Sequence, residues 1–354
     1  MAWAGPSPAA HHGYCAERSP LSKLTAVPAP RQDLSSEELR PSYEPEISVL
    51  IVNYRTPDLV LRCVESLRRH AGELPMEVLI ADNASGDGSA ERFREQLPDC
   101  ELIEHNKNLG FGAAQNRLFA RAKSAQILIL NPDTEILPGA IQAMRKALAT
   151  RPEIAVCGPK TCFVDGRQQA SAFPFPSPAR EFLNTSVIGA ILRRIPVISS
   201  WLRLLPAPTQ SQKVDYLQGS CLLCRREAFA AVQGFDEDFF LFSEEVDLQR
   251  RMASRGLGAF FVAEAEIVHQ QGRSMELAPI RNYVQLYRAK RQYFAKHASA
   301  LGSILVERQW RSFHLSRALL LSAMGRLGSN RAKHKAELHW AAWRFLRGEE
   351  EQDA

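Results

Sequence analysis

The sequence contains no apolar run of the roughly 18 residues that a membrane-spanning helix requires. Its N-terminus also lacks the basic start and the apolar segment of a secretory signal. Its seven cysteines are an odd number without paired Cys-x-x-Cys sets at zinc-binding spacing. The Cys-x-x-Cys from Cys221 to Cys224 encloses two leucines, which is typical of buried thiols. We therefore expect a chain that is neither secreted nor membrane-spanning and works in a reducing, cytoplasmic compartment.

The common nucleotide-binding and calcium-binding motifs are missing too. No Gly-x-x-x-x-Gly-Lys-Ser/Thr occurs, which excludes the P-loop NTPases. The glycine pair that begins at Gly110 follows the third predicted strand and has Gln115 where a dinucleotide-binding motif needs its third glycine, which argues against a dehydrogenase. Residues 82–88 have the outline of a calcium loop, but Ala84 and Gly86 occupy two ligand positions.

Strand and helix patterns alternate from Ile47 onward. Residues 1–45 hold seven prolines and no sustained apolar period, which predicts a disordered N-terminal extension. Short apolar runs then predict strands at 47–52, 77–81, 101–104 and 125–130, separated by helices beginning at Pro57, Ser89 and Ala113. This alternation predicts an α/β fold with a mostly parallel central sheet, whose ligand crevice lies at the carboxyl ends of the strands.

Each of these predicted strands is followed by short polar side chains. Taken singly, such residues are most often turn formers or helix caps. Four sets at the same edge of one sheet converge on one crevice, for which a nucleotide is the natural occupant. The sets are Asn53; Asp82 and Asn83; Asn106 and Asn108; and Asn131 and Asp133.

An acidic helix start and a single histidine are two further candidates. Glu244, Glu245 and Asp247 follow an aromatic run and open a predicted helix. Acids there are stabilised by the helix dipole, and Asp247 can pair with Arg251 four residues later, so the spacing leaves a structural role open. His269 follows a predicted strand, and a lone histidine is more often structural than functional.

The C-terminal fifth is strongly basic. Residues 281–348 contain 14 Lys and Arg against two Glu, a net charge of +12, so that the +5 of the whole chain leaves −7 for the remainder. Two apolar helix faces are predicted, one with Phe313, Leu315, Leu319, Leu320 and Met324 and one with Trp340, Trp343 and Leu346. We expect residues 280–354 to form basic amphipathic helices that associate with an anionic membrane surface. The alternative is that they pack on the rest of the protein; nucleic acid is not expected, since no binding motif accompanies the charge.

Taken together, these motifs resemble glycosyltransferase family 2, inverting enzymes with the GT-A fold, and most closely its rhamnosyltransferase-like branch. The resemblance places a GT-A-type nucleotide-sugar-binding domain at residues 46–279. The residues that carry it are Ile51–Tyr54, Asp82–Ser89, Asn106–Gly112, Leu130–Thr134, the segment from Gly219 to Glu237, Glu244–Leu248, and His269 with Gly272.

The resemblance implies a role for each motif. Donor-binding residues would be Asn53 and Asp82, which would hold the base and ribose of a nucleotide sugar, with Asn83, Asn108, Gly110 and Asn131. Asp133 and His269 would ligate a divalent metal. The catalytic base would be Glu245, with Glu244 as the alternative. This chain departs from the family pattern twice, since Asn131 replaces an Asp and Glu245 is one methylene longer than the usual Asp.

The implied reaction is metal-assisted transfer of a sugar, by single displacement, from a nucleoside-diphosphate sugar to a glycan or lipid-linked acceptor. The donor would be dTDP- or UDP-linked, the sugar a deoxyhexose such as rhamnose, and the metal Mg²⁺ or Mn²⁺. A lipid-linked acceptor would place the enzyme at the inner face of the cytoplasmic membrane. The alternatives are a UDP-hexose or galactofuranose donor, or a catalytically silent nucleotide- or glycan-binding module.

Overall fold

The computed structural model describes residues 44–192, 194–197, 208–270 and 279–349, and within them a ten-stranded mixed sheet forms the centre. Its main order is β3-β2-β1-β4-β11-β6-β12-β5, while β7 pairs with β6 and β9 with β12. The strands are β1 (Ile47–Asn53), β2 (Met76–Asp82), β3 (Glu101–Glu104), β4 (Gln126–Leu130), β5 (Thr134–Ile136), β6 (Ile154–Cys162), β7 (Gln168–Gln169), β9 (Gln212–Val214), β11 (Cys221–Arg225) and β12 (Gly258–His269). A separate pair joins β8 (Ala172–Phe173) to β10 (Tyr216–Leu217).

Strands β1 to β4 run parallel to one another, as the strand and helix pattern predicts. Strand β11 then runs antiparallel to both β4 and β6, so the sheet is mixed on its far side. The helices of this part are α1 (Pro57–His70), α2 (Ser89–Gln96), α3 (Phe111–Arg121), α4 (Ala140–Ala149), α8 (Arg226–Ala231) and α9 (Glu244–Ala253). The expected α/β fold with a mostly parallel central sheet is confirmed.

Both faces of the sheet are buried, which explains why its central strands are mostly apolar; in β1, the buried Ser48 donates a hydrogen bond to Glu77. In β1, Ile47, Val49 and Ile51 point to one face and pack with α1, α2 and α4. The alternate residues Leu50 and Val52 point to the other face and pack with α3, α8 and α9. A strand covered on both sides needs apolar residues at most positions before its polar end.

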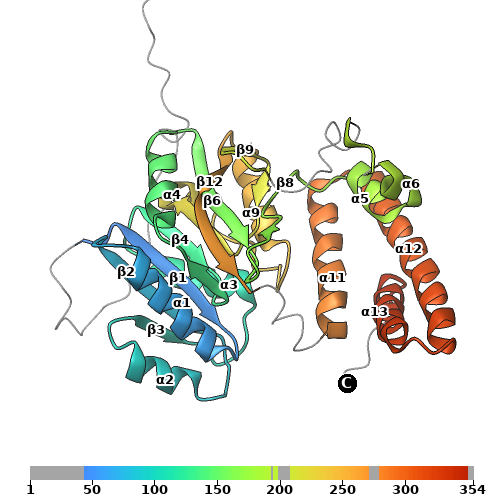
Figure 1. Cartoon of the computed structure of the whole chain (residues 1–354), viewed down its shortest axis with the longest axis horizontal. Helices are drawn as coiled ribbons and strands as arrows, with labels where there is room; N and C mark the ends of the chain where they lie inside the picture. Colours follow the sequence, from blue (N-terminus) through green and yellow to red (C-terminus); the bar gives the residue numbers. More distant parts are fainter. Residues whose placement is uncertain (1–43, 193, 198–207, 271–278, 350–354) are drawn as a thin grey trace, which may run out of the picture.

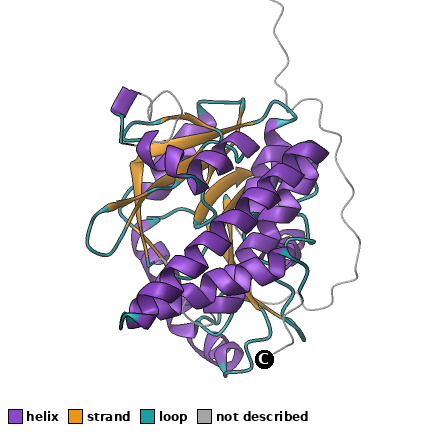
Figure 2. Ribbon diagram, turned by 90° about the vertical axis from the view of Figure 1, so that its right-hand side faces the viewer, coloured by secondary structure: helices purple, strands orange, loops and turns teal. Residues whose placement is uncertain are grey.

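Three long helices follow the sheet part: α11 (Pro279–His297), α12 (Ala300–Arg326) and α13 (Asn330–Leu346). In Figure 1 they lie to the right of the sheet, with α5 (Pro178–Thr185) and α6 (Val187–Leu192) at their upper end. Figure 2 views the molecule from that side, where long helices cross in front of the sheet. No described helix is both long and apolar enough to cross a bilayer.

An aromatic core joins these helices to the sheet part. Phe239, in the loop before α9, and Val246, in the first turn of α9, pack with Tyr287 and Tyr293 of α11 and with Trp310 of α12. On α13, the predicted apolar face of Trp340, Trp343 and Leu346 is partly covered by other helices. Leu346 is fully buried in this core, and the indole Nε1 of Trp340 donates to the Ser322 hydroxyl at 3.1 Å. The tryptophan stripe therefore belongs to contacts among the helices.

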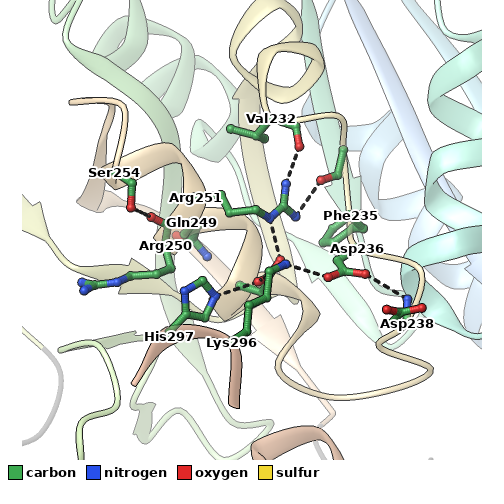
Figure 3. A network of polar contacts seen from close by, with 12 residues as sticks. Val232, Phe235, Asp236, Asp238, Gln249, Arg250, Arg251, Ser254, Lys296 and His297 are labelled. Carbon is green, nitrogen blue, oxygen red and sulfur yellow. Dashed lines mark hydrogen bonds and ion pairs between the residues drawn. The ribbon is translucent and has the colours of Figure 1, made fainter. Parts of the chain in front are cut away.

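A buried carboxylate also ties α9 to α11. Asp247 has no exposed surface, and its oxygens lie 2.6 Å from Arg251 Nε, 2.7 Å from Lys296 Nζ and 2.8 Å from His297 Nε2. Figure 3 shows Arg251, Lys296 and His297 pointing toward one another between the two elements. Burial alone would raise the pKa of Asp247. Hydrogen bonds from His297 and Lys296, together with Arg251, instead lower this pKa to about 2. The predicted pair of Asp247 with Arg251 is present.

Replacing Asp247 by Asn should destabilise the protein by about 3 kcal/mol, because it leaves a cluster of cations without its buried anion. In the wild type this contribution is present above the ordinary Asp pKa of about 4 and is lost as pH falls through about 2. Chemical unfolding followed by circular dichroism at neutral pH measures the difference. Asp238→Asn, at an exposed position in the preceding loop, is the matched control; equal stability of both variants would contradict the assignment.

Candidate active site

The strand ends that carry polar residues meet at one edge of the sheet because of the pairing register. Asn53, the last residue of β1, pairs with Asp82, the last of β2, and Ile51 pairs with Leu130 at the end of β4. Strand β11 runs the other way, so its first residue, Cys221, also pairs with Leu130. The residues that follow β1, β2 and β4 therefore share this edge with those that precede β11.

Asn53 and Asp82 form a buried polar cluster here. The amide of Asn53 donates to Asp82 Oδ1 at 2.7 Å and to the Ser85 hydroxyl at 3.0 Å. Asn53 Oδ1 accepts from both the backbone N–H and the hydroxyl of Thr56, each at 3.2 Å. The backbone N–H of Ser85 donates to Asp82 Oδ2 at 3.1 Å. Both predicted residues are thus brought together and held in fixed orientations.

A second amide cluster lies next to the first. The side chain of Asn83 donates to Asn108 Oδ1 at 2.9 Å and to the carbonyl of Gly110 at 3.2 Å, and it accepts from Leu109 N–H at 2.9 Å. Asn108 Oδ1 accepts the N–H of Gly110 as well, at 2.9 Å. Three more of the predicted residues therefore fix the loop between β3 and α3.

An open depression of about 560 Å³ adjoins these clusters. Among its lining residues are Asp82, Gly86, Ser89 and His105. The Nε2 atom of His105 is buried there without a hydrogen-bond partner among the described residues. A depression of this size, with an acid, a hydroxyl and an imidazole along its wall, suits a polar ligand such as a nucleoside.

Asp133 and His269 are adjacent although 136 positions separate them. Pairing of His269 at the end of β12 with Thr134 of β5 places its Nε2 atom 3.2 Å from Asp133 Oδ1. The amide of Gln169 donates to the His269 carbonyl at 2.7 Å, which leaves Gln169 Oε1 to accept the Nδ1 proton at 3.2 Å. When Nδ1 carries the proton, the lone pair of a neutral imidazole lies on Nε2, the atom that faces the Asp133 carboxylate.

This pair suits a divalent cation. Two electron-pair donors 3.2 Å apart are stabilised by a positive charge beside both, and carboxylate with imidazole is a donor set that Mg²⁺ or Mn²⁺ accepts. The described residues contain no group of three or more His, Cys, Asp or Glu side chains arranged for a metal. A cation bound beside this pair would need further ligands. Asn131 lies at the start of the same turn, with its N–H bonded to the Ser220 carbonyl at 2.9 Å.

The two glutamates at the start of α9 have different surroundings. Glu244 is buried, its Oε2 has no partner among the described residues, and burial together with the neighbouring Glu245 charge raises its pKa well above the usual range. Glu245 is half-buried beside Gly219, where a Cβ would lie 3.3 Å from the Cβ of Glu245. Burial raises the pKa of Glu245 to about 6. Glu245 therefore gives up its proton first.

The turn before α9 is strained and firmly held. Phe242 and Ser243 both have positive φ, 71° and 65°, a rare conformation for non-glycine residues. The carbonyl of Phe240 accepts the N–H of Phe111 at 2.9 Å, which attaches this turn to the start of α3. Further back, Asn116 of α3 exchanges hydrogen bonds with the backbone N–H and carbonyl of Phe235, both at 2.9 Å. Helix α3 thereby positions both glutamates.

The chain belongs to glycosyltransferase family 2: the family model "Glycosyl transferase family 2" matches residues 48–232. It is accordingly a nucleotide-sugar-dependent glycosyltransferase, and its relatives point to the rhamnosyltransferase-like branch.

Two curated relatives and one solved structure illustrate the similarity. N-acetylglucosaminyl-diphospho-decaprenol L-rhamnosyltransferase of Mycobacterium tuberculosis is 33% identical over 239 residues, which cover 64% of this chain and 77% of that protein. O-antigen biosynthesis protein RfbC of Myxococcus xanthus is 26% identical over 261 residues, 70% of this chain and 19% of that protein. The structure of a Pyrobaculum calidifontis mannosyltransferase in complex with GDP-Man and Mn²⁺ is 18% identical, with a TM-score of 0.48 over 86% of this chain and 85% of that one.

Sequence reasoning missed three side chains of this site. Ser85 and His105 stand beside residues that were singled out, so the strand-end pattern could have included them. Gln169 lies on a two-residue strand in an irregular stretch, and only the three-dimensional structure shows that it orients His269. Gly272, part of the motif around His269, lies outside the described residues.

Gly110→Ala should destabilise the protein by about 2 kcal/mol or more and weaken donor binding. Its φ is +84°, and an added Cβ would lie 2.3 Å from the Phe240 carbonyl oxygen, so the turn before α9 must move. Gly139→Ala is the matched control, with φ +80° and nothing within 4 Å of the added Cβ. Thermal unfolding and titration with nucleoside diphosphates measure both effects. Identical losses in the two variants would show that backbone strain alone is responsible.

Proposed function

We propose that this protein transfers rhamnose, with inversion, from a nucleoside-diphosphate sugar to a glycan carried on a polyprenyl diphosphate. The observation that carries the choice of sugar and acceptor is the 33% identity over 239 residues to an enzyme named as an N-acetylglucosaminyl-diphospho-decaprenol L-rhamnosyltransferase. An acceptor of this kind would place the enzyme at the inner face of the cytoplasmic membrane.

The nucleoside half of the donor is assigned to the depression beside β2 and β3. Asp82 lies both in this depression and in the cluster with Asn53, so its carboxylate is available to ribose hydroxyls. Asn83, Asn108 and Gly110 shape the adjoining loop. The diphosphate would extend from there toward Asn131 and Asp133, at the end of the neighbouring strand β4.

Asp133 and His269 are assigned as ligands of Mg²⁺ or Mn²⁺. A bound divalent cation would neutralise the charge that builds up on the leaving diphosphate, whose oxygens would complete the coordination shell. Gln169 Oε1 accepts a hydrogen bond from the protonated Nδ1 of His269, which would leave the Nε2 lone pair free for the metal. Support for the assignment comes from the 3.2 Å approach of two electron-pair donors.

Glu245 is assigned as the general base. The acceptor hydroxyl oxygen attacks the anomeric carbon from the face opposite the diphosphate. As the new C–O bond forms and the bond to the diphosphate breaks, the hydroxyl proton passes to the Glu245 carboxylate. With a pKa of about 6, Glu245 is ionised at neutral pH, whereas its buried neighbour Glu244 holds its proton more tightly. No covalent intermediate is needed, since a single displacement inverts the configuration.

A panel of donors tests the substrate and the metal together. We expect dTDP-linked rhamnose with Mn²⁺ to raise the melting temperature and support transfer, and UDP-hexose and UDP-galactofuranose to do neither. Asp133→Ala should abolish transfer and metal-dependent donor binding while the fold survives, with Glu135→Gln as a control for local charge. Near-normal turnover of Asp133→Ala in EDTA would remove the metal assignment. Transfer from a UDP-linked sugar alone would replace rhamnose by that sugar.

Glu245→Gln keeps the size of the side chain and removes its basicity, so kcat should fall by roughly 10²–10⁴ with nearly unchanged donor affinity. Glu244→Gln should reduce kcat less. In the wild type, kcat should decline as pH falls through about 6, because the base becomes protonated. Steady-state kinetics from pH 5 to 8 measure all three. A larger effect at Glu244 would move the base there, and two mild effects would favour the silent-module alternative.

A further inference from the structure

Helix α12 carries exposed apolar residues near both of its ends, although other described elements cover one side of it. The covered side carries Gly302, Val306, Trp310, His314 and Ala318, spaced four residues apart, and packs against α5, α11 and α13. Outside this covered side lie two groups of exposed apolar residues, at 301–305 and 319–327, and the exposed residues between them, among them Arg311, Ser312 and Ser316, are polar. We call the two groups, with Arg308 and Arg326, the outer face of α12; it consists of Leu301, Ile304, Leu305, Arg308, Leu319, Leu320, Met324, Arg326 and Leu327.

The exposure of this outer face is large. Leu301, Leu305, Leu319 and Leu327 are 66%, 53%, 55% and 88% exposed, two near each end of a helix of 27 residues. At 1.5 Å per residue the two groups lie about 20 Å apart along the helix axis. Clustered exposed apolar residues mark contact surfaces, whereas single exposed leucines need no partner. In Figure 1, α12 lies at the edge of the molecule away from the sheet, so no other described element covers it.

Helices α5 and α6 add further exposed apolar residues beside the first turns of α12. Gln309 of α12 donates to the Thr185 hydroxyl at 3.3 Å, and Trp310 Nε1 donates to Glu181 at 3.0 Å, so α5 lies along α12. Phe182 of α5 and Ile188 and Ile191 of α6 are 45%, 55% and 56% exposed. The apolar surface therefore extends beyond one helix.

Positive charges are set into and around this surface. Arg308 and Arg326 are exposed and 18 residues apart, which is five helical turns, so both lie on one line within the outer face. Arg331, Lys333 and Lys335, on the adjoining helix α13, are also exposed. Leucines with interspersed arginines are the composition of helices that lie in a bilayer interface, where the apolar chains enter the acyl boundary and the guanidinium groups reach the headgroups.

We propose that the outer face of α12, together with the exposed residues of α5 and α6, docks onto the surface of an anionic lipid bilayer. Charge complementarity favours this occupant over a second copy of the chain. A twofold contact through the same face would bring Arg308 and Arg326 against the same basic surface of the other copy, whereas acidic headgroups neutralise them.

Docking through this face also suits the proposed active site, and this step rests on the proposed transfer to a lipid-linked acceptor. Glu181 of α5 binds Trp310 of α12 and Lys290 of α11. Tyr216 of β10 packs against the aromatic core that contains Val246, the residue after Glu245, together with Tyr287 and Trp310 of the C-terminal helices. Tyr216 thus lies between the candidate base and the helices that carry the docking face. A membrane-borne acceptor would approach Glu245 from that side.

The experiment uses the full-length protein, vesicles of phosphatidylcholine with or without phosphatidylglycerol, and sedimentation. The wild type should bind the anionic vesicles, and high salt should weaken binding. Leu305→Glu with Leu319→Glu replaces two exposed residues of the outer face and should lower the partition coefficient at least about tenfold. Val164→Glu with Ala149→Glu makes the same charge change at exposed positions of the sheet part and should bind like the wild type.

Three results would overturn the proposal: a wild type that ignores anionic vesicles, equal binding by both double variants, or a wild-type dimer that becomes monomeric in the Leu305/Leu319 variant without vesicle binding. Sedimentation equilibrium provides the mass. The Leu305/Leu319 variant should keep its transfer rate to a water-soluble acceptor and lose it only with the acceptor in vesicles. Vesicle binding needs no donor or acceptor, so a failure of the rhamnosyl assignment leaves this test intact.

Discussion

The parallel pairing of β1 with β2 and β4 is the constraint on which the site depends. Because Asn53 pairs with Asp82 and Ile51 with Leu130, the chain leaves three neighbouring strands at one edge, and the polar residues that follow meet there. A shift of one residue would separate Asn53 from Asp82 and turn every β1 side chain to the opposite face of the sheet. Close packing on both faces makes such a shift costly, so the packing that stabilises the sheet also positions the candidate donor-binding side chains.

Helix α9, which carries the candidate base Glu245, is positioned by a second set of contacts, independent of the strand register. Asn116 holds Phe235, Phe240 accepts from Phe111, and two residues with positive φ then turn the chain into the helix. The cost of that strained turn is offset by its attachment to α3. Two adjacent glutamates emerge with unequal burial, Glu244 buried and Glu245 half-buried. Burial raises the pKa of both carboxyl groups, and the neighbouring Glu245 charge adds to the rise at Glu244.

Local sequence patterns revealed the first half of the fold because each strand there is a short apolar run closed by a polar residue. Strand β3 has the predicted bounds, and helix α2 begins at the predicted residue, Ser89. Contacts between distant segments were not readable in this way. Gln169 reaches His269 across 100 residues, and nothing in its own stretch marks it. Trp340 and Leu346 show a helical stripe whose spacing is the same whether it faces lipid, solvent or a neighbouring helix, and here the neighbour is a helix.

The salt-bridge cluster around Asp247 has a consequence for how this enzyme can be divided. Two of the side chains that bind that carboxylate, Lys296 and His297, are the last residues of α11, while the carboxylate sits two positions after the candidate base. A chain shortened before Lys296 would keep the whole sheet and every candidate site residue. It would nevertheless leave Asp247, a buried anion in the helix that carries Glu245, with Arg251 as its remaining cationic partner. The catalytic part thus depends on the C-terminal helices for side chains that bind Asp247, and a minimal active fragment has to retain α11.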